Sequence, residues 1–77
     1  MSQAFSEIIQ EHSFHFQPVE IGDKLSYHVN VADDEGVRWE FRMEENQNAE
    51  WELKGEKLPG WISEIEQEIG AIIKSHG

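Results

Sequence analysis

With only 77 residues, the chain is expected to form one small domain over residues 1–77, whose core buries a limited share of the apolar surface. Its 16 acidic and 6 basic residues give a formal net charge of −10, which disfavours binding to nucleic-acid phosphates and to anionic membranes. The absence of cysteine excludes disulfides, thiolate chemistry and cysteine-ligated zinc.

The first predicted element is a helix over residues 3–12. Its evidence is a stripe of side chains at helical spacing, formed by Phe5, Ile8, Ile9 and His12. Glu7 and Glu11 would lie on the opposite, solvated side. Ten residues are too few for a stable isolated helix, so this one would have to pack against the rest of the domain.

Four strands are predicted next, at residues 14–20, 25–31, 37–44 and 49–55. Apolar and polar residues alternate in them, as an antiparallel sheet with one solvated face requires. From Leu25 to Leu53 the odd-numbered residues are the apolar set, so we expect these to face the core. Pro18 lacks an amide hydrogen and predicts that the first strand lies at a sheet edge. The alternation weakens after Pro18, and a bulge there would restore it.

Charge pairing on the polar face favours one register for each of two hairpins. In the first hairpin, His28 would lie opposite Glu40. In the second, Arg42 would lie opposite Glu52, whereas a shift by one pair would place Glu40 opposite Glu52. Like charges directly opposite each other are unfavourable, so we predict the first arrangement.

A second helix is predicted over residues 59–75. Pro59 suits the first helical position, where its missing amide hydrogen costs nothing. One sector of the helix carries the apolar side chains Trp61, Ile62, Ile65, Ile69, Ile72 and Ile73. Gly70 lies beside this sector and would allow close approach to the sheet or to another chain.

These elements predict an α+β domain in the order α-β-β-β-β-α. The short connections favour a four-stranded antiparallel meander, with strand order 1-2-3-4 and both helices packed on its one apolar face. The first residues lack the basic start and apolar run of a signal peptide, and no apolar stretch reaches membrane-spanning length. We therefore expect a cytoplasmic protein.

No motif in the sequence indicates catalysis. His15 and His28 could lie diagonally on the solvated face with Glu40 nearby, but no metal-ligand spacing is present, and ordinary surface histidines explain them more simply. The acidic turn at 33–36 lacks the pattern of a calcium loop. Acid–base catalysis needs a carboxyl group whose pKa is shifted by burial or by a close partner, and almost all of the carboxylates fall on predicted solvated faces. We predict no catalytic residue, no cofactor and no metal site.

The function predicted by elimination is that of a non-enzymatic protein-binding module of adaptor, chaperone-like or inhibitor type. Its partner would be another protein, and the chain itself a monomer or weak homodimer. The predicted interaction surface combines the solvated sheet face with a tryptophan of the last helix: His15, His28, Arg38, Glu40, Arg42, Glu52 and Trp61. A simpler interpretation of Trp61 is that it caps the small core.

Two further possibilities stay open. A sheet edge could accept a strand from a partner, and the last strand is the better candidate because Pro18 impairs the first. The alternative function is a small-ligand binder or minor enzyme with a pocket between helices and sheet, lined by Phe14, Phe16, Tyr27 and Trp39.

Overall fold

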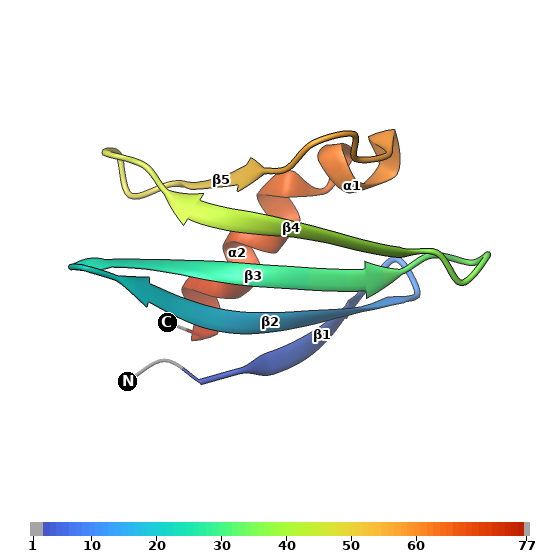
Figure 1. The fold of residues 1–77 in the computed structure, drawn as a ribbon, viewed down its shortest axis with the longest axis horizontal. Coiled ribbons are helices and arrows are strands. Elements are labelled where there is room, and N and C mark those ends of the chain that lie inside the picture. The colour runs from blue at the N-terminus through green and yellow to red at the C-terminus, as the bar shows by residue number, and fades with distance from the viewer. Residues whose placement is uncertain (1–2, 77) are drawn as a thin grey trace.

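A computed structural model describes residues 3–76 as one antiparallel sheet with two helices packed on one of its faces (Figure 1). The strand order is β1-β2-β3-β4-β5, so every strand pairs with its neighbours in the chain. The elements are β1 (Phe5–Ile9), β2 (His12–Ile21), β3 (Lys24–Ala32), β4 (Arg38–Glu45), β5 (Trp51–Lys54), α1 (Gly60–Glu64) and α2 (Glu66–His76). The predicted α+β class and meander are confirmed, but the sheet has five strands instead of four.

The predicted N-terminal helix is wrong, because residues 5–9 form the edge strand β1. Gln10 and Glu11 have φ angles of 51° and 67°, and the chain reverses through them so that Ile9 lies opposite His12. These angles match a type I′ hairpin turn, which normally takes Asn-Gly. Phe5 stacks on its cross-strand neighbour Phe16 with ring centroids 4.6 Å apart. This contact with β2 outweighs the helical spacing that the local sequence shows.

Two turns are built alike and fix the register of the last three strands. The carboxylate of Asp33 accepts the N–H groups of Glu35 and Val37, each at 2.9 Å. The side-chain amide oxygen of Asn46 accepts those of Asn48 and Glu50, at 2.8 and 3.1 Å. A residue with positive φ follows in each turn, Gly36 at 82° and Ala49 at 62°. Asp and Asn favour such turns because their side chains hydrogen-bond to backbone further along.

The predicted registers are therefore wrong in both hairpins. The backbone hydrogen bond between Asp33 and Val37 closes the first turn. This places His28 opposite Arg42 instead of Glu40. The backbone hydrogen bond between Asn46 and Glu50 closes the second turn. This places Arg42 opposite Lys54 instead of Glu52. The hydrogen bonds of the turns outweigh exposed charge pairs, which are worth only about 0.2–1 kcal/mol each.

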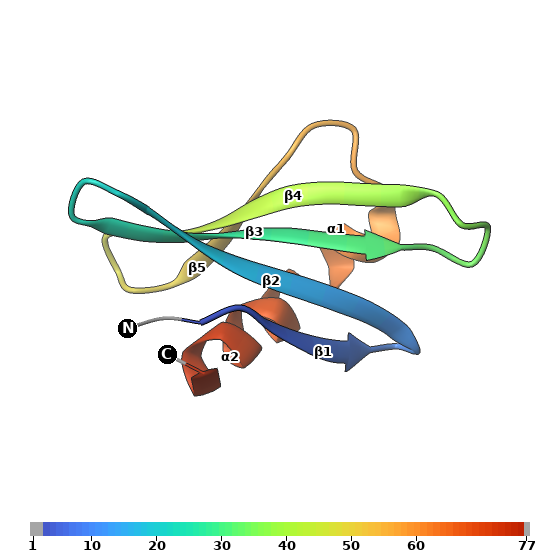
Figure 2. The ribbon, with the colours of Figure 1, turned by 60° about the horizontal axis from the view of Figure 1, so that its bottom comes forward.

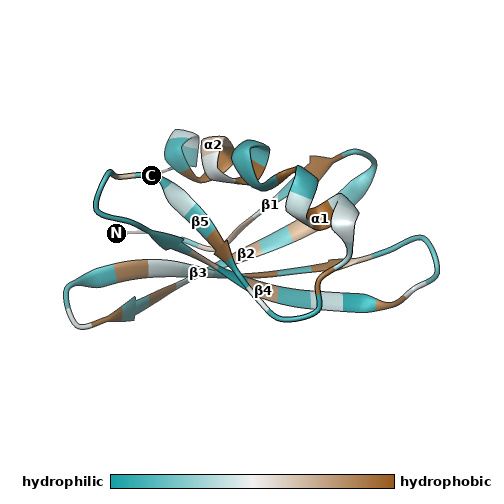
Figure 3. Cartoon of the chain, turned by 90° about the horizontal axis from the view of Figure 1, so that it is seen from above, coloured by the Kyte–Doolittle hydropathy of each residue, from teal (hydrophilic) through white to brown (hydrophobic). Residues whose placement is uncertain are grey.

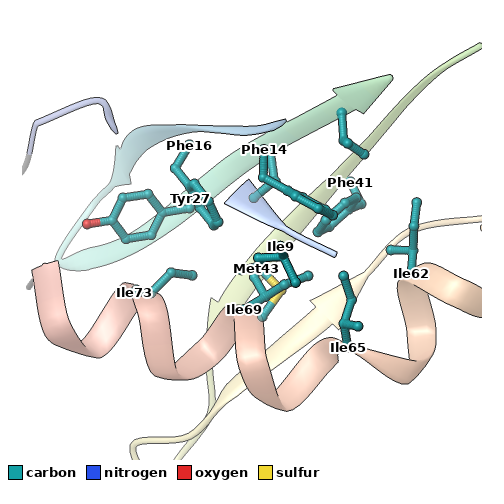
Figure 4. Packing of buried hydrophobic residues seen from close by; sticks show 12 residues of the cluster. Ile9, Phe14, Phe16, Tyr27, Phe41, Met43, Ile62, Ile65, Ile69 and Ile73 are labelled. Carbon is teal, nitrogen blue, oxygen red and sulfur yellow. The ribbon is translucent and has the colours of Figure 1, made fainter. Parts of the chain in front are cut away.

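The predicted facing is confirmed for Tyr27, Val29, Val31, Phe41 and Met43, which are all buried, but not for Val37, which precedes β4 and is 46% exposed. Trp39, Trp51 and Leu53 are partly buried against the same core. Figure 4 shows the core side chains between the sheet and the helices. Figure 3 shows that both helices run along one side of the sheet and leave its other side uncovered, which we call the outer face.

The bulge predicted after Pro18, in the strand at 14–20, is absent. The pairing of β2 with β3 runs without offset from Phe14 opposite Val31 to Ile21 opposite Lys24. Val19 and Ile21 consequently point to the outer face, where they are 38% and 67% exposed. The strand is also not an edge along its whole length, because β1 pairs with it as far as Phe16.

The predicted C-terminal helix is present but divided in two at Ile65. The N–H of Ile65 donates to the carbonyl of Ile62 at 3.2 Å, a tighter spacing than in an α-helix, and Ile65 has φ −103° and ψ 16°. Ile62 and Ile65, three residues apart, both face the core, at 0% and 1% exposure. Gly70 of α2 is buried against β5, where a Cβ at position 70 would lie 3.3 Å from the Cβ of Trp51.

Candidate protein-docking site

Most of the predicted interaction residues lie together on the outer face. The pairing of strands places His15 beside Asn30 and Glu40 in one row, and His28 beside Arg42 and Lys54 in the next. The structure brings these predicted residues together on the outer face: His15, His28, Arg38, Glu40, Arg42 and Glu52.

Trp61 lies apart from them, on the helix side of the sheet. Its ring stacks on that of His12, with centroids 4.4 Å apart, and meets Phe14 edge-on at 6.1 Å. Trp61 therefore covers one end of the core, which agrees with the simpler interpretation made from the sequence.

The charged groups of the outer face pair mainly with charged or polar side chains of the same face. Arg38 donates to the side-chain oxygen of Asn30 at 2.6 Å, and Arg42 lies 3.7 Å from Glu44. Lys54 lies 3.3 Å from Glu52. These pairs are exposed, so each stabilises the fold only slightly.

Glu52 is also fixed by its neighbours. A hydrogen bond from Asn46 and the nearby Lys54 ammonium hold the pKa of Glu52 below its usual value. A carboxylate with a lowered pKa stays ionised at neutral pH and is poorly suited to act as a general acid or base.

The direction of the backbone groups decides which sheet edges are open. In an antiparallel strand, the N–H and C=O of successive residues point to opposite sides. The N–H of Asp33 donates to the carbonyl of Val37 at 2.9 Å, so the hydrogen-bonded pairs that follow are Trp39 with Val31 and Phe41 with Val29. Trp39 and Phe41 therefore turn their backbone groups toward β3. Arg38 and Glu40 turn theirs the other way.

β5 does not reach this part of β4. It pairs only with Arg42–Glu45, and Figure 1 shows it ending while β4 continues. Within residues 3–76, neither the pairing of strands nor any hydrogen bond of turns and loops provides a partner for the outward backbone groups of Arg38 and Glu40. An unpaired strand segment of this kind is a template for an incoming strand.

A groove lies beside this segment, with a volume of about 540 Å³. Its walls come from the outer face of β3 and β4 and from the chain that leaves β5; Figure 2 shows that chain rising away from β4. The groove is lined by His28, Glu40, Phe41, Arg42, Leu53, Lys54, Gly55 and Glu56. By comparison, the depression that Ser6 and Phe16 line on the outer face has about 250 Å³.

Two other edges are protected. The same alternation of backbone directions continues from β4 through β3 to β2. It turns the nitrogen of Pro18 away from β3, toward the edge of β2 that β1 no longer covers beyond Phe16. Proline has no N–H to offer there. On β5, the N–H of Leu53 donates to Glu66 Oε2 of α2 at 2.7 Å, and α2 lies against Trp51 at Gly70. The last strand, which the sequence favoured for strand addition, thus has an edge occupied by α2.

A second polar cluster lies where the turns at 10–11 and 33–36 meet α1. His12 Nε2 is 3.3 Å from Asp34, and His12 Nδ1 is buried without a partner in the described chain. The indole N–H of Trp39 donates to Asp33 at 3.1 Å, and this bond, followed by those from Val37 and Glu35, lowers the pKa of Asp33. Because its oxygens already accept three N–H groups, Asp33 organises the turn. Residues 3–76 contain no group of His, Asp or Glu side chains able to hold a metal ion.

The pocket proposed between helices and sheet coincides with the core. Phe14, Phe16 and Tyr27 are at most 1% exposed, and Trp39 is partly buried against them. Their side chains fill the place that a ligand would need.

The chain matches no protein-family model, no curated protein and no solved structure in the comparisons made with them. None of the helices in the described part of the chain combines the length and apolar character needed to cross a membrane.

Sequence reasoning missed the open segment of β4 because it assigned the third and fourth strands nearly equal lengths. The sequence signal for this difference was that the alternation of apolar and polar residues extends further in the third predicted strand than in the fourth. The pattern of β4 runs from Val37 to Met43, whereas only Trp51 and Leu53 continue it after the turn, before Gly55. A strand with a shorter neighbour must expose part of its edge.

Proposed function

We propose that this chain is a non-enzymatic protein-binding module, which takes an extended segment of a partner protein onto the open edge of β4. The supporting observation is the outward backbone of Arg38 and Glu40, which has no strand partner within the described residues, beside a groove of about 540 Å³ that Glu40 lines. A segment added there would gain main-chain hydrogen bonds as a sixth strand does, independently of most side chains.

The contrast with the open part of β2 and with β5 supports the choice of β4. Pro18 removes a donor from the open part of β2, and Glu66 already holds the N–H of Leu53 on β5. β1 turns the backbone of Ser6 and Ile8 outward as well, so it serves as the comparison edge in the test. A small-ligand site receives less support, since the residues named for it are packed in the core.

The decisive experiment uses the full chain as bait for a displayed library of random peptides. Glu40→Pro removes the outward N–H of β4 without breaking its ladder to β3, because that N–H does not point toward β3. We expect wild type to enrich peptides and the Glu40→Pro variant to lose them, with its circular dichroism spectrum and unfolding transition retained.

Two proline controls match this variant. Glu20→Pro removes the same charge and an outward N–H on the open part of β2, and should leave peptide binding unchanged. Ile8→Pro blocks the edge of β1 and should also leave it unchanged. Loss of binding in Ile8→Pro with retention in Glu40→Pro would contradict the assignment to β4.

A further inference from the structure

The open segment of β4 carries one cation and one anion on the same face. Arg38 and Glu40 lie two residues apart, so both side chains project to the outer face. Arg38 is bonded to the neutral amide of Asn30 at 2.6 Å, and Glu40 is 3.5 Å from His28. Within residues 3–76, neither of them forms an ion pair with a Lys, Arg, Asp or Glu side chain. Both charges are therefore available to recognise a segment that pairs with β4.

The charges that flank this segment lie further away and have both signs. Glu56 lines the groove, and Lys57 follows it in the chain. Asp34 lies in the turn at the other end, 3.3 Å from His12. Flanking charges of this kind act on the net charge of an incoming segment, whereas Arg38 and Glu40 act on the order in which its charges occur. The order is therefore the property that the edge itself distinguishes.

A strand added to β4 would place its residues in defined surroundings. Every strand pair in this sheet is antiparallel, and antiparallel pairing is slightly the more stable kind. The outward backbone groups of Arg38 and Glu40 would form hydrogen-bonded pairs, whose side chains share the outer face. The residue between these pairs would lie opposite Trp39 on the helix side, in a non-hydrogen-bonded pair, where side chains approach most closely. Because Trp39 packs against the core, an apolar residue fits this middle position.

The two charges of β4 then determine the order of the partner charges. Opposite charges on directly paired residues are favourable, and like charges are unfavourable. An acidic residue therefore belongs opposite Arg38, and a basic residue belongs opposite Glu40. Because the added strand runs antiparallel to β4, its basic residue comes first in its chain. A guanidinium has five N–H donors, so Arg38 can bind the acidic residue and keep its bond to Asn30.

Resting on the function proposed above, we infer that the β4 edge selects an extended partner segment with a basic, an apolar and an acidic residue in this order, bound antiparallel. The charges set the direction and register of the segment, while the backbone of Arg38 and Glu40 supplies the hydrogen bonds. A second copy of the chain offers the same order in Arg38, Trp39 and Glu40, but each copy carries a net charge of −10 and repels another. A partner segment without this excess of negative charge meets no such repulsion.

The test compares two synthetic peptides of the same composition, Thr-Val-Lys-Val-Glu-Val-Thr and Thr-Val-Glu-Val-Lys-Val-Thr. The side chains of each peptide carry no net charge, so the acidic chain as a whole attracts or repels both equally. Binding to the full chain is measured by NMR titration at low and at high salt. We expect the peptide with lysine first to bind about fivefold more tightly at low salt, and this preference to shrink at high salt.

Exchanging the two charges of β4 locates the effect. Arg38→Glu combined with Glu40→Arg keeps the net charge of the chain and should invert the preference. The matched control is Glu20→Lys combined with Lys24→Glu, which exchanges two exposed charges at the opposite end of the sheet and should preserve the preference. A preference that the exchange on β4 leaves unchanged would overturn the inference.

Failure of this inference and failure of the proposed function give different results. Equal binding of the two peptides, both lost in Glu40→Pro, would overturn the charge order and leave the proposed function standing. Tighter binding of the peptide with glutamate first would overturn the antiparallel register. Failure of both peptides to bind, or binding that Glu40→Pro retains, would overturn both proposals. A dimer in sedimentation experiments that Glu40→Pro dissociates would assign the edge to a second copy of the chain instead of a partner segment.

Discussion

Glycine at position 11 should stabilise this protein, although the same change would destabilise a helix. Gln10 and Glu11 have φ angles of 51° and 67°, in the left-handed region that residues with a Cβ adopt at a cost of roughly 1–2 kcal/mol each. Glycine adopts this region freely but loses more conformational entropy on folding. The net gain expected for Glu11→Gly is about 0.5–1 kcal/mol in the free energy of unfolding.

The sign of this change separates two structures of the N-terminal segment. In the predicted helix over residues 3–12, glycine at position 11 would lower stability by up to about 1 kcal/mol. In the hairpin, the midpoint of thermal unfolding should rise by about 2–8 °C. Adding Gln10→Asn supplies the other residue that the type I′ turn favours and should increase the gain.

Chemical denaturation with urea, followed by tryptophan fluorescence, measures the change. Asp23→Gly is the matched control, because Asp23 lies in the neighbouring two-residue turn with Gly22 but has no positive φ. This control should lower stability slightly. A destabilised Glu11→Gly, accompanied by loss of helical signal in circular dichroism, would refute the hairpin.

Three further changes test the rest of the fold. Because the pKa of Asp33 is lowered in the folded chain, the ionised carboxylate adds to the free energy of unfolding above the ordinary aspartate pKa, and this contribution disappears as pH falls through the folded pKa. Urea titrations across acidic pH should therefore show the difference in stability between wild type and Asp33→Asn closing on acidification. A constant difference would contradict this role of Asp33. Glu66→Ala leaves the N–H of Leu53 without its acceptor and should cost about 1–3 kcal/mol in urea unfolding; an unchanged midpoint would argue against the cap on β5. Ile69→Ala opens a cavity at a fully buried position and should cost about 2–5 kcal/mol by the same assay, whereas a cost below about 1 kcal/mol would place Ile69 outside the core.

The facing of the sheet residues could be predicted because a strand has a side-chain period of two. Tyr27, Val29 and Phe41 alternate with polar neighbours over long runs, and no other structure satisfies that pattern as well. The register could not be predicted from charge pairs. It depends on the hydrogen bonds of Asp33 and Asn46 in their turns, which are stronger determinants than exposed ion pairs.

The N-terminal strand could not be predicted for a different reason. Its turn uses Gln10 and Glu11, which give no turn signal, and Phe5 is held by Phe16 and by His76, whose ring stacks on it at 3.9 Å. Contacts across such a distance in the chain leave no local pattern. The candidate site was likewise predictable only in part. Its outer-face side chains could be predicted from the alternation, whereas the unpaired backbone of β4 depends on where β5 ends.

The proposed function depends on the backbone of Arg38 and Glu40 facing an open edge of the sheet. Amide hydrogen exchange followed by NMR tests it residue by residue. We expect the amides of Arg38 and Glu40 to exchange at least about a hundredfold faster than those of Trp39 and Phe41, and to slow when a peptide enriched by the wild-type chain is added. A Glu40 amide protected as strongly as that of Phe41 in the unbound chain would contradict the claim.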